Sequence, residues 1–342
     1  MDPDAILTPW VTISAGAALA GVMAYAILGG ADFGGGVWDL FAFGPRKQQQ
    51  RMAIQKAMGP VWEANHVWMI FVIVVLFTCF PQGYAALGIA LFLPFHLALM
   101  GIMLRGAAFV FRSDQCRHKE EVANTSTWGV VFGVASLISP MVLGTAFGMV
   151  TEGAVRVSET GQVDLTQPLP WLSPYALGNG LLATVSCAYL AAVYLTNETD
   201  GELREDFRQR AIWAGTTTAL LAGLVFVLAW FEARWFCERL LSWRVLPVVT
   251  AGLVCFAGSA WGVFTRHFRW SRIFAAGEIL LLLLGWGLAQ YPFLIYPDVT
   301  FAGAAAPTPT LIFMIASLPV GAALLIPSLW LLFSVFSDHN RG

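Results

Sequence analysis

Charged side chains are scarce in this 342-residue chain, because Asp, Glu, Lys and Arg make up only 12% of it. That share is about half the one found in soluble domains. Hydrophobic residues account for 58%, and the mean hydropathy is +0.69. A water-soluble fold of this length could not bury so much apolar surface. The composition therefore excludes a soluble enzyme and predicts a polytopic membrane protein.

Cysteine is also sparse, and no CxxC or metal-ligand spacing occurs. The five cysteines are scattered over the chain: Cys79, Cys116, Cys187, Cys237 and Cys255. This pattern excludes a disulfide framework and a zinc site and predicts free thiols. The start of the chain, MDPDAILTPW, lacks the basic segment of a cleaved signal peptide, so the first apolar run is expected to remain as a membrane span.

Nine apolar runs are long enough, or nearly so, to cross a bilayer, which takes about 20 helical residues. They cover residues 10–43, 54–80, 84–111, 128–150, 174–195, 211–230, 245–265, 273–291 and 311–336. Their length and lack of alternation indicate helices rather than strands. The expected fold is an all-α polytopic membrane protein with nine transmembrane helices, forming a single membrane domain over residues 1–342.

Lys and Arg are distributed unevenly between the two sets of connections. The segments at and after the ends of the first, third, fifth and seventh spans, with the C-terminal tail, hold 15 of the 19 basic residues. The positive-inside rule then places the N-terminus outside and the C-terminus in the cytoplasm. Of the outer connections, residues 151–173 form the longest polar loop. Residues 231–244 mix Trp and Arg like an interfacial helix, although ordinary connectors would explain both.

Acidic side chains interrupt three of the predicted spans. Counting about 1.5 Å of rise per residue from the span ends, Asp32, Glu63 and Glu278 fall at one depth near the cytoplasmic margin. A charged acid at a helix centre costs about 2.5–3.5 kcal/mol, and less nearer the interface, so a carboxyl there readily takes up a proton. His66, one turn deeper than Glu63, could continue the transfer. These four residues form a predicted proton path.

Two simpler interpretations compete with this path. The acids could pair with a snorkelling arginine such as Arg105, and His66 and His96 could be packing residues. The glycines around Asp32, in GGADFGGG, allow either close helix packing or room for water.

The chain is poorly equipped for redox chemistry of its own. Glu63 and His66 form an E-x-x-H pair, but a di-iron bundle needs a second such pair, and none occurs. Only His66 and His96 lie within spans, and their depths differ, so a shared haem is not expected. No metal site is predicted.

Several segments resemble the signature segments of subunit II of cytochrome bd-type quinol oxidases. GGADFGGGVWDL, GPVWEANHVW and LRGAAFVFR are similar to the family patterns D-G-F-D-x-G-x-G, P-x-W-D-G-N-x-V-W and R-x-x-x-F-x-[FY]-R. SPYALGNGLL, YLTNETDGELREDFRQRA and QYPFLIYPDVT are similar in place and character. The resemblance covers nearly the whole chain, and its tryptophan-rich element is the most specific part.

The resemblance implies two four-helix bundles with one peripheral helix, in a bacterial inner membrane. It implies a subunit of an enzyme that couples quinol oxidation to the reduction of oxygen to water. This chain would carry no haem, would stabilise a haem-bearing subunit I and would contribute a cytoplasm-facing proton path. The partner would hold b-type haem, and whether it also holds d-type haem stays open. Small accessory subunits with a single span are also open. The other partners are the lipid bilayer and the quinol pool; no nucleic acid is expected.

The resemblance carries over to particular residues. Asp32 takes the place of the second acid of the first pattern, and Glu63 replaces the aspartate of the second. Arg105 and Arg112 match the two arginines of the third, as structural or ion-pairing residues.

Trp62 and Asn65 fall at the Trp and Asn of the second pattern and are assigned the same structural role. Gly29 stands where the family has its first acid, and His66 where it often has Gln or Glu. These departures leave open the haem types of the partner and whether oxygen is the acceptor.

Two other functions stay open on the sequence alone. A secondary transporter could use buried acids for proton or cation coupling, since the glycine-interrupted first span is typical of transport sites. A b-type cytochrome could use His66 and His96 as ligands.

Overall fold

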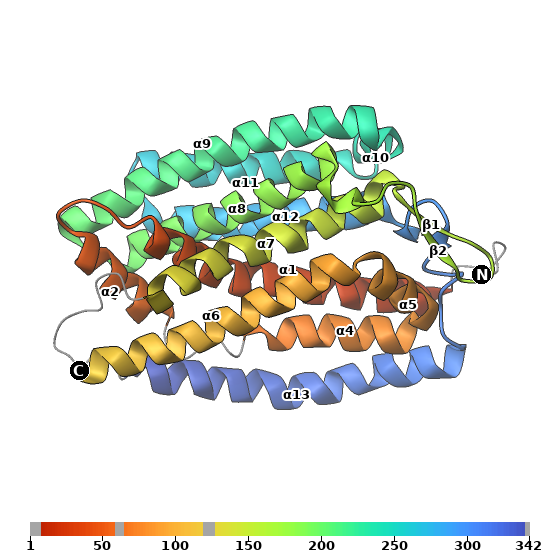
Figure 1. Ribbon diagram of the computed structural model, residues 1–342, viewed down its shortest axis with the longest axis horizontal. Helices are drawn as coiled ribbons and strands as arrows, with labels where there is room; N and C mark the ends of the chain where they lie inside the picture. The colour runs from red at the N-terminus through yellow and green to blue at the C-terminus, as the bar shows by residue number, and fades with distance from the viewer. Residues whose placement is uncertain (1–7, 59–64, 119–126, 339–342) are drawn as a thin grey trace.

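Long helices lying side by side dominate the computed structural model, which describes residues 8–58, 65–118 and 127–338 (Figure 1). The helices are α1 (Pro9–Leu40), α2 (Lys47–Met58), α4 (Val67–Cys79), α5 (Pro81–Ala90), α6 (Phe92–His118), α7 (Thr127–Glu152), α8 (Pro174–Glu198), α9 (Gly201–Glu232), α10 (Arg234–Leu240), α11 (Leu246–Phe264), α12 (Phe268–Gln290) and α13 (Thr308–Asp338). Within the described part, eight of them are long and apolar enough to cross a membrane, and α4 is a shorter apolar helix.

Two small antiparallel hairpins lie at one end of the molecule. In the first, β1 (Val155–Val157) pairs with β2 (Val163–Leu165), with Arg156 opposite Asp164. In the second, β3 (Phe293–Ile295) pairs with β4 (Val299–Thr300) through an irregular register. A 3₁₀ turn, Pro170–Leu172, precedes α8. The predicted loop over residues 151–173 is therefore largely a hairpin, and the predicted interfacial segment contains α10.

One of the predicted spans was wrong as a continuous helix. The span over residues 84–111 divides at Leu91 into α5 and α6, because Pro94 has no N–H to donate to the Ala90 carbonyl and its ring crowds that turn. The described parts of the span predicted over residues 54–80 include the end of α2 and the whole of α4, and residues 59–64 lie outside the described residues. Since α2 is a polar helix, KQQQRMAIQKAM, its residues favour the water boundary rather than the hydrocarbon.

Helix α1 lies at the centre of the packing and contacts α4, α7, α8, α12 and α13. Its glycines allow two very close approaches. A Cβ at Gly34 would overlap the backbone carbonyl of Cys187 on α8, and a Cβ at Gly36 would overlap the Ser136 side chain on α7. Small residues thus let helix backbones approach without side chains between them.

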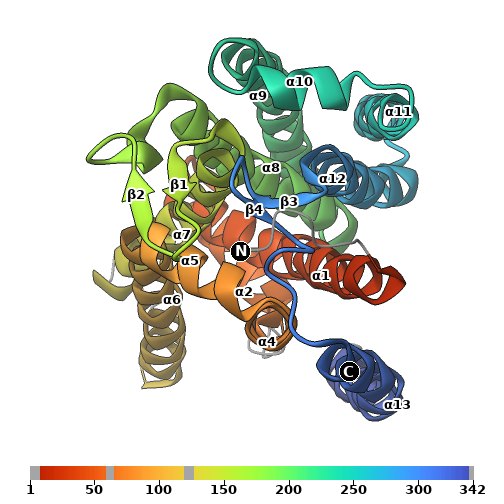
Figure 2. The same cartoon turned by 90° about the vertical axis from the view of Figure 1, so that its right-hand side faces the viewer.

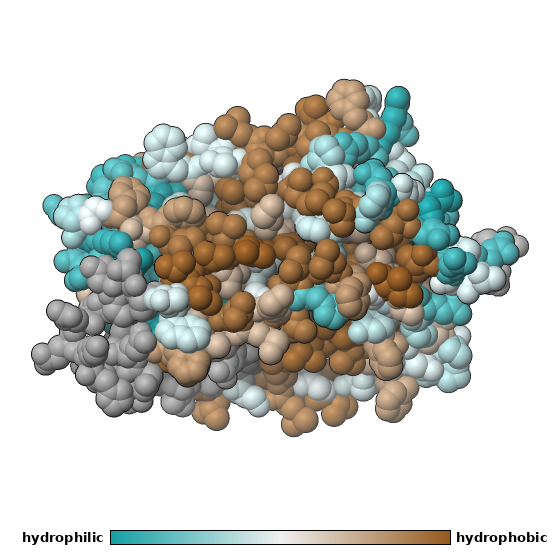
Figure 3. Space-filling view, viewed as in Figure 1, coloured by the Kyte–Doolittle hydropathy of each residue, from teal (hydrophilic) through white to brown (hydrophobic). Residues whose placement is uncertain are grey.

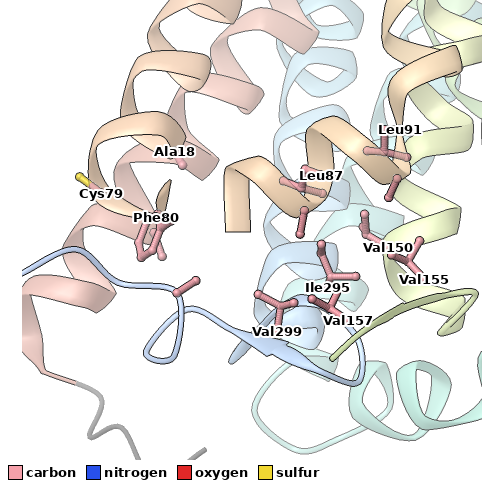
Figure 4. Close-up of a cluster of buried hydrophobic side chains, with 14 of the residues drawn as sticks. Ala18, Cys79, Phe80, Leu87, Leu91, Val150, Val155, Val157, Ile295 and Val299 are labelled. Carbon is pink, nitrogen blue, oxygen red and sulfur yellow. The ribbon is translucent and has the colours of Figure 1, made fainter. Parts of the chain in front are cut away.

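A large apolar cluster closes the end of the molecule that carries the hairpins (Figure 4). Phe80 and Leu91 belong to it together with Val155 from β1 and Ile295 from β3, and all four are at most 2% exposed. Burial of this kind is worth about 25 cal/mol per Å² of apolar surface. The cluster therefore anchors both hairpins to the helices.

The face of the molecule shown in Figure 3 is mostly apolar around the middle and more polar toward both ends. Helix α13 stands apart from the other helices, with α1 and α4 as its main neighbours among the described elements (Figure 2). Large side chains along it are exposed, including Phe313 at 75% and Leu324 at 70%. Such an apolar surface suits a hydrocarbon environment.

Ion pairs connect the predicted cytoplasmic segments at the opposite end from the hairpins. Arg46, after α1, contacts Asp206 and Glu202 at the start of α9. Glu205 on the same helix is paired with Arg266, between α11 and α12. The basic segments that the sequence assigns to one side of the membrane therefore meet at one end of the fold.

Candidate functional site

Asp32 lies on α1 beside the residues that lead into α4. The Asn65 side chain donates a hydrogen bond to the Asp32 carboxylate and another, of 3.3 Å, to the Leu28 carbonyl. His66 Nδ1 shares a hydrogen bond of 3.3 Å with the Tyr25 hydroxyl, also on α1. Three of the residues singled out in the sequence thus lie together, and Tyr25 joins them as a contact that the sequence did not indicate.

Arg105 on α6 is the only fully buried cation near this group within the described residues. Its side chain is 1% exposed, and its Nε donates to Ser136 Oγ at 3.1 Å. The guanidinium lies 5.0 Å from the Phe33 ring centre and 5.2 Å from that of Phe132, distances typical of cation–π contacts. Its charge acts on Asp32, but no hydrogen bond joins the two side chains within the described residues. Asp32 therefore has a counter-charge nearby without a direct ion pair.

A hollow of about 110 Å³ reaches Asp32 from the end of the molecule that carries the ion pairs. We call it the Asp32 hollow. Asp32 and Gly35 line it from α1, Tyr194 and Glu198 from α8, and Arg272 from α12. The hollow is large enough for several water molecules, each of which occupies about 30 Å³ in the liquid.

The far side of the Asp32 hollow is formed by a water-exposed ion pair. Arg272 Nη1 lies 3.4 Å from Glu198 Oε1, and the side chains are 47% and 53% exposed. The Arg272 guanidinium also lies 4.6 Å from the Tyr194 ring centre. The hollow thus joins groups in contact with water to a carboxyl group inside the fold.

Arg112 forms a different kind of site. It donates two hydrogen bonds to Asp39, of 2.7 and 3.0 Å, and the two side chains are 7% and 1% exposed. The Asp39 backbone carbonyl also accepts a hydrogen bond from Arg51. This buried, bidentate pair fixes the end of α1 to α6. Sequence reasoning named Arg112 but missed Asp39, although Asp39 follows Asp32 by two helical turns on the same face.

Glu278 on α12 does not join the Asp32 group in any contact of the described residues. It is 8% exposed, and its Oε2 is buried without a hydrogen-bond partner. Its charge acts on Tyr189 of α8, whose hydroxyl lies 2.6 Å from Ser259 Oγ. The equal depth expected for Asp32 and Glu278 therefore does not bring the two carboxyl groups together.

Other predicted residues lie elsewhere. Glu63 and Trp62 fall outside the described residues. His96 on α6 is exposed, and its Nδ1 lies 2.7 Å from the Phe92 carbonyl, so it does not face the site of His66. In the described part of the chain, no group of three or more His, Cys, Asp or Glu side chains is placed to hold a metal ion.

The family model for cytochrome bd terminal oxidase subunit II matches residues 10–336. The chain belongs to this family. It is a subunit of a membrane oxidoreductase, located in the bacterial inner membrane with several spans, and a catalytic subunit I is its partner. The family implies haems in that partner and a quinol substrate. Membership favours the oxidase over the transporter.

Individual relatives resemble this subunit II over most of their length. A putative cytochrome bd menaquinol oxidase subunit II of Bacillus subtilis is 24% identical over 94% of this chain and 93% of its own. The cytochrome bd-I ubiquinol oxidase subunit 2 of Escherichia coli K12 is 26% identical, covering 83% and 81% of the two chains. The bd oxidase structure from Geobacillus thermodenitrificans matches with a TM-score of 0.79 at 23% identity, over 96% of this chain and 99% of that one. It shows a shared fold.

Proposed function

We propose that this chain is the haem-free subunit II of a quinol oxidase, which stabilises the haem-bearing subunit I and supplies it with protons from the cytoplasm. The observation that carries the proposal is the Asp32 hollow, which joins a water-exposed ion pair to a partly buried carboxyl group within the fold. A polar, hydrated passage to a titratable group is what proton delivery across a low-dielectric region needs.

The chemistry requires such a supply. Reduction of one O₂ to two waters consumes four electrons and four protons, and oxidation of two quinols releases the same numbers. When quinol is oxidised at the outer side and protons are taken from the inner side, charge is separated across the membrane. Each charge is worth about 2.3 kcal/mol per 100 mV.

Each residue of the site has a distinct part in this proposal. Asp32 accepts the proton, and the Asn65 amide holds its carboxylate in one orientation. The charge of Arg105 acts on Asp32 and offsets part of the cost of a carboxylate at this depth. His66 and Glu63 continue the transfer toward the partner.

Glu278 belongs to a second, separate relay position beside Tyr189. Its part in proton transfer rests on its burial and on the absence of a basic partner in the described contacts.

The haem-free assignment is supported by the two histidines within the spans. An axial ligand offers a ring nitrogen to the iron, and two ligands of one haem face each other across it. His66 lies inside the fold beside Tyr25, whereas His96 is exposed on α6 against Phe92. These two side chains do not face one another.

We also propose the finer architecture. Nine spans result when α4 is counted with the eight longer helices. One bundle is formed by α1, α4, α6 and α7, a second by α8, α9, α11 and α12, and α13 is peripheral. Contacts of α8 with both α1 and α7 make the two bundles one membrane domain. The basic residues place the α2 end and the C-terminus in the cytoplasm.

The decisive experiment replaces Asp32 by Asn in the assembled complex. Asn keeps the shape and can still accept a hydrogen bond from Asn65, so the fold should persist. We expect turnover and proton uptake to fall by roughly 100-fold, the low end of what a positioned proton-transfer group contributes, with the haem content unchanged. Asp164→Asn, in the exposed hairpin strand β2, is the control. Undiminished turnover and proton uptake in Asp32→Asn would remove Asp32 from the path.

A further inference from the structure

We propose that Glu198 is the carboxylate that collects protons from cytoplasmic water and passes them to Asp32. This inference rests on the proposed proton-uptake function and names the first group of its path. Within the described lining of the Asp32 hollow, Glu198 and Asp32 are the two acidic side chains, and Glu198 is the more exposed of the two.

The spacing on α8 explains why Glu198 faces the Asp32 hollow. Ala191, Tyr194, Leu195 and Glu198 line it from this helix, at the i, i+3, i+4, i+7 positions that share one face. Glu198 is the last residue of α8. Its side chain therefore stands where the apolar helix meets water, at the end of a row of residues that leads inward to Asp32.

Neighbouring contacts hold the end of α8 in place. The Asn197 side chain donates to the Phe268 carbonyl at the start of α12, at 3.2 Å. This contact brings Arg272 of α12 to Glu198, and the Tyr194 ring lies beneath the Arg272 guanidinium. The geometry of the outer end of the hollow is thus set by α8 and α12 together.

The Glu198–Arg272 contact is loose enough for exchange. Its N···O distance of 3.4 Å exceeds the 2.7–2.9 Å of a tight charge-assisted hydrogen bond, and both side chains are about half exposed. One carboxylate oxygen can therefore accept a proton from water without the rupture of a buried ion pair. Arg272 holds Glu198 beside the hollow and is a positioning residue.

The other charged side chains near Glu198 form their contacts with other groups. On α9, Arg204 donates to the Thr199 carbonyl and to Asp200. Helix α2 lines the hollow only with Ile54 and Ala57, and α1 contributes Asp32 as its one charged residue there. Arg272 is the cation that faces Glu198 in the described contacts.

The transfer balances without any further reactant. A hydronium ion gives a proton to the Glu198 carboxylate and leaves a water molecule. The resulting carboxylic acid passes a proton through water in the hollow to the Asp32 carboxylate and becomes a carboxylate again. Asp32 then gives its proton to the next group of the path, which resets both residues for the next proton.

The test compares Glu198→Gln with Glu202→Gln in the intact complex reconstituted into vesicles. Glu202 is also an acid at this end of the molecule, 82% exposed and paired with Arg46, and it does not line the hollow. Oxygen pulses with a pH-sensitive dye measure proton uptake, and turnover is followed from pH 6 to pH 9.

We expect Glu198→Gln to slow proton uptake about tenfold, since it removes one group of a transfer chain, and more strongly at high pH, where hydronium is scarce. Glu202→Gln should behave as the parent complex, and Glu198→Asp should recover most of the rate. Haem content and complex yield show that each variant is assembled.

Three results would overturn the proposal. Normal uptake in Glu198→Gln, with slow uptake in Asp32→Asn, would show that protons reach Asp32 by another way, and the proposed function would stand. Normal uptake in both variants would overturn the proposed function itself. Equal slowing in Glu202→Gln would indicate a general effect of surface charge.

Discussion

Three carboxyl groups within or near the spans differ in their nearest partners. Asp39 is bound by two nitrogens of Arg112 and Asp32 by the amide of Asn65, whereas one oxygen of Glu278 has no hydrogen-bond partner within the described residues. A carboxylate and a guanidinium that are buried together depend on each other, because removal of either charge leaves the other uncompensated. The partner of each acid therefore separates a structural role for Asp39 from a proton-transfer role for Asp32.

This distinction predicts the behaviour of Asp39→Asn. Loss of one charge from a buried pair costs about 3–5 kcal/mol, so we expect the variant complex to lose its folded state at a clearly lower temperature. Turnover per assembled complex should be unchanged, because Asp39 takes no part in proton transfer. Thermal denaturation followed by the haem spectrum measures the stability, and oxygen consumption per haem measures the turnover.

The matched control is Glu238→Gln. Glu238 pairs with Arg234 one turn away on α10, with both side chains more than 60% exposed, and such pairs contribute about 0.3–0.5 kcal/mol. Little change in thermal stability is expected. A large loss of turnover in Asp39→Asn, with normal thermal stability, would contradict the structural role of Asp39.

Helices depend on both the length of their apolar runs and local interruptions. The run lengths predict seven of the nine spans as continuous helices, since a helix satisfies its own backbone hydrogen bonds wherever its side chains are apolar. Pro94 could have predicted the division at Leu91. The polar sequence of α2 shows that the start of the span predicted over residues 54–80 favours the water boundary.

The candidate site was predictable only in part. Depth along a helix follows from residue number, and this count correctly predicted that Asp32 lies near the segment around Asn65. It says nothing about rotation around a helix, and so it did not separate Glu278, beside Tyr189, from Asp32. The hollow that joins Asp32 to Glu198 lies between α1, α2, α8 and α12. It depends on how these four helices pack together, which the sequence pattern of one segment does not show.

Two glycines of α1 differ in the space around them, and alanine substitutions at the two positions should therefore have different effects on stability. A methyl group at Gly34 would overlap the Cys187 carbonyl, whereas the space around Gly16 is open. Since backbone atoms cannot move aside cheaply, Gly34→Ala should destabilise the complex by about 1–3 kcal/mol. Gly16→Ala should be neutral or stabilising by up to about 1 kcal/mol. Thermal denaturation of the two complexes is the measurement, and equal stability would show that α1 and α8 are less tightly packed.

The two hairpins are connected by an ion pair that predicts a pH dependence. Asp298 accepts hydrogen bonds from Arg156, at 2.7 and 3.0 Å, and from the Val157 N–H, at 2.9 Å. Partial burial raises the pKa of Asp298, but these bonds and the charge of Arg156 outweigh it and bring the pKa below its ordinary value. The folded state thus binds this proton less readily than the unfolded chain.

Asp298→Asn should accordingly lower thermal stability at pH 7. A carboxyl with a lowered pKa stabilises the fold above its unfolded pKa of about 3.9, and this contribution is lost as pH falls through the lower folded value. The difference between parent and variant should therefore be full above pH 5 and shrink below pH 4. Denaturation temperatures measured over this range test the prediction, and a difference that grows toward low pH would contradict it.

At the scale of the whole molecule, polar groups are segregated by end. The hairpins, their apolar cluster and the Arg156–Asp298 pair occupy one end, and the pairs of Arg46, Glu205 and Arg272 occupy the other (Figure 1). The Asp32 hollow lies toward the second end. The proposed function consequently has a direction: protons should be taken up only from the side where Glu198 and Arg272 meet water.

Vesicles with the complex in a single known orientation test this direction. With the α2 end facing the medium, an oxygen pulse in the presence of quinol should make the medium alkaline at the rate of oxygen reduction. With the opposite orientation, the interior should become alkaline and the medium acidic, because protons released by quinol oxidation then appear outside. Asp32→Asn should slow both signals equally, since the same path supplies both. Alkalinisation on the hairpin side in the first orientation would mean that protons enter from the other end of the molecule and that the Asp32 hollow is not their route.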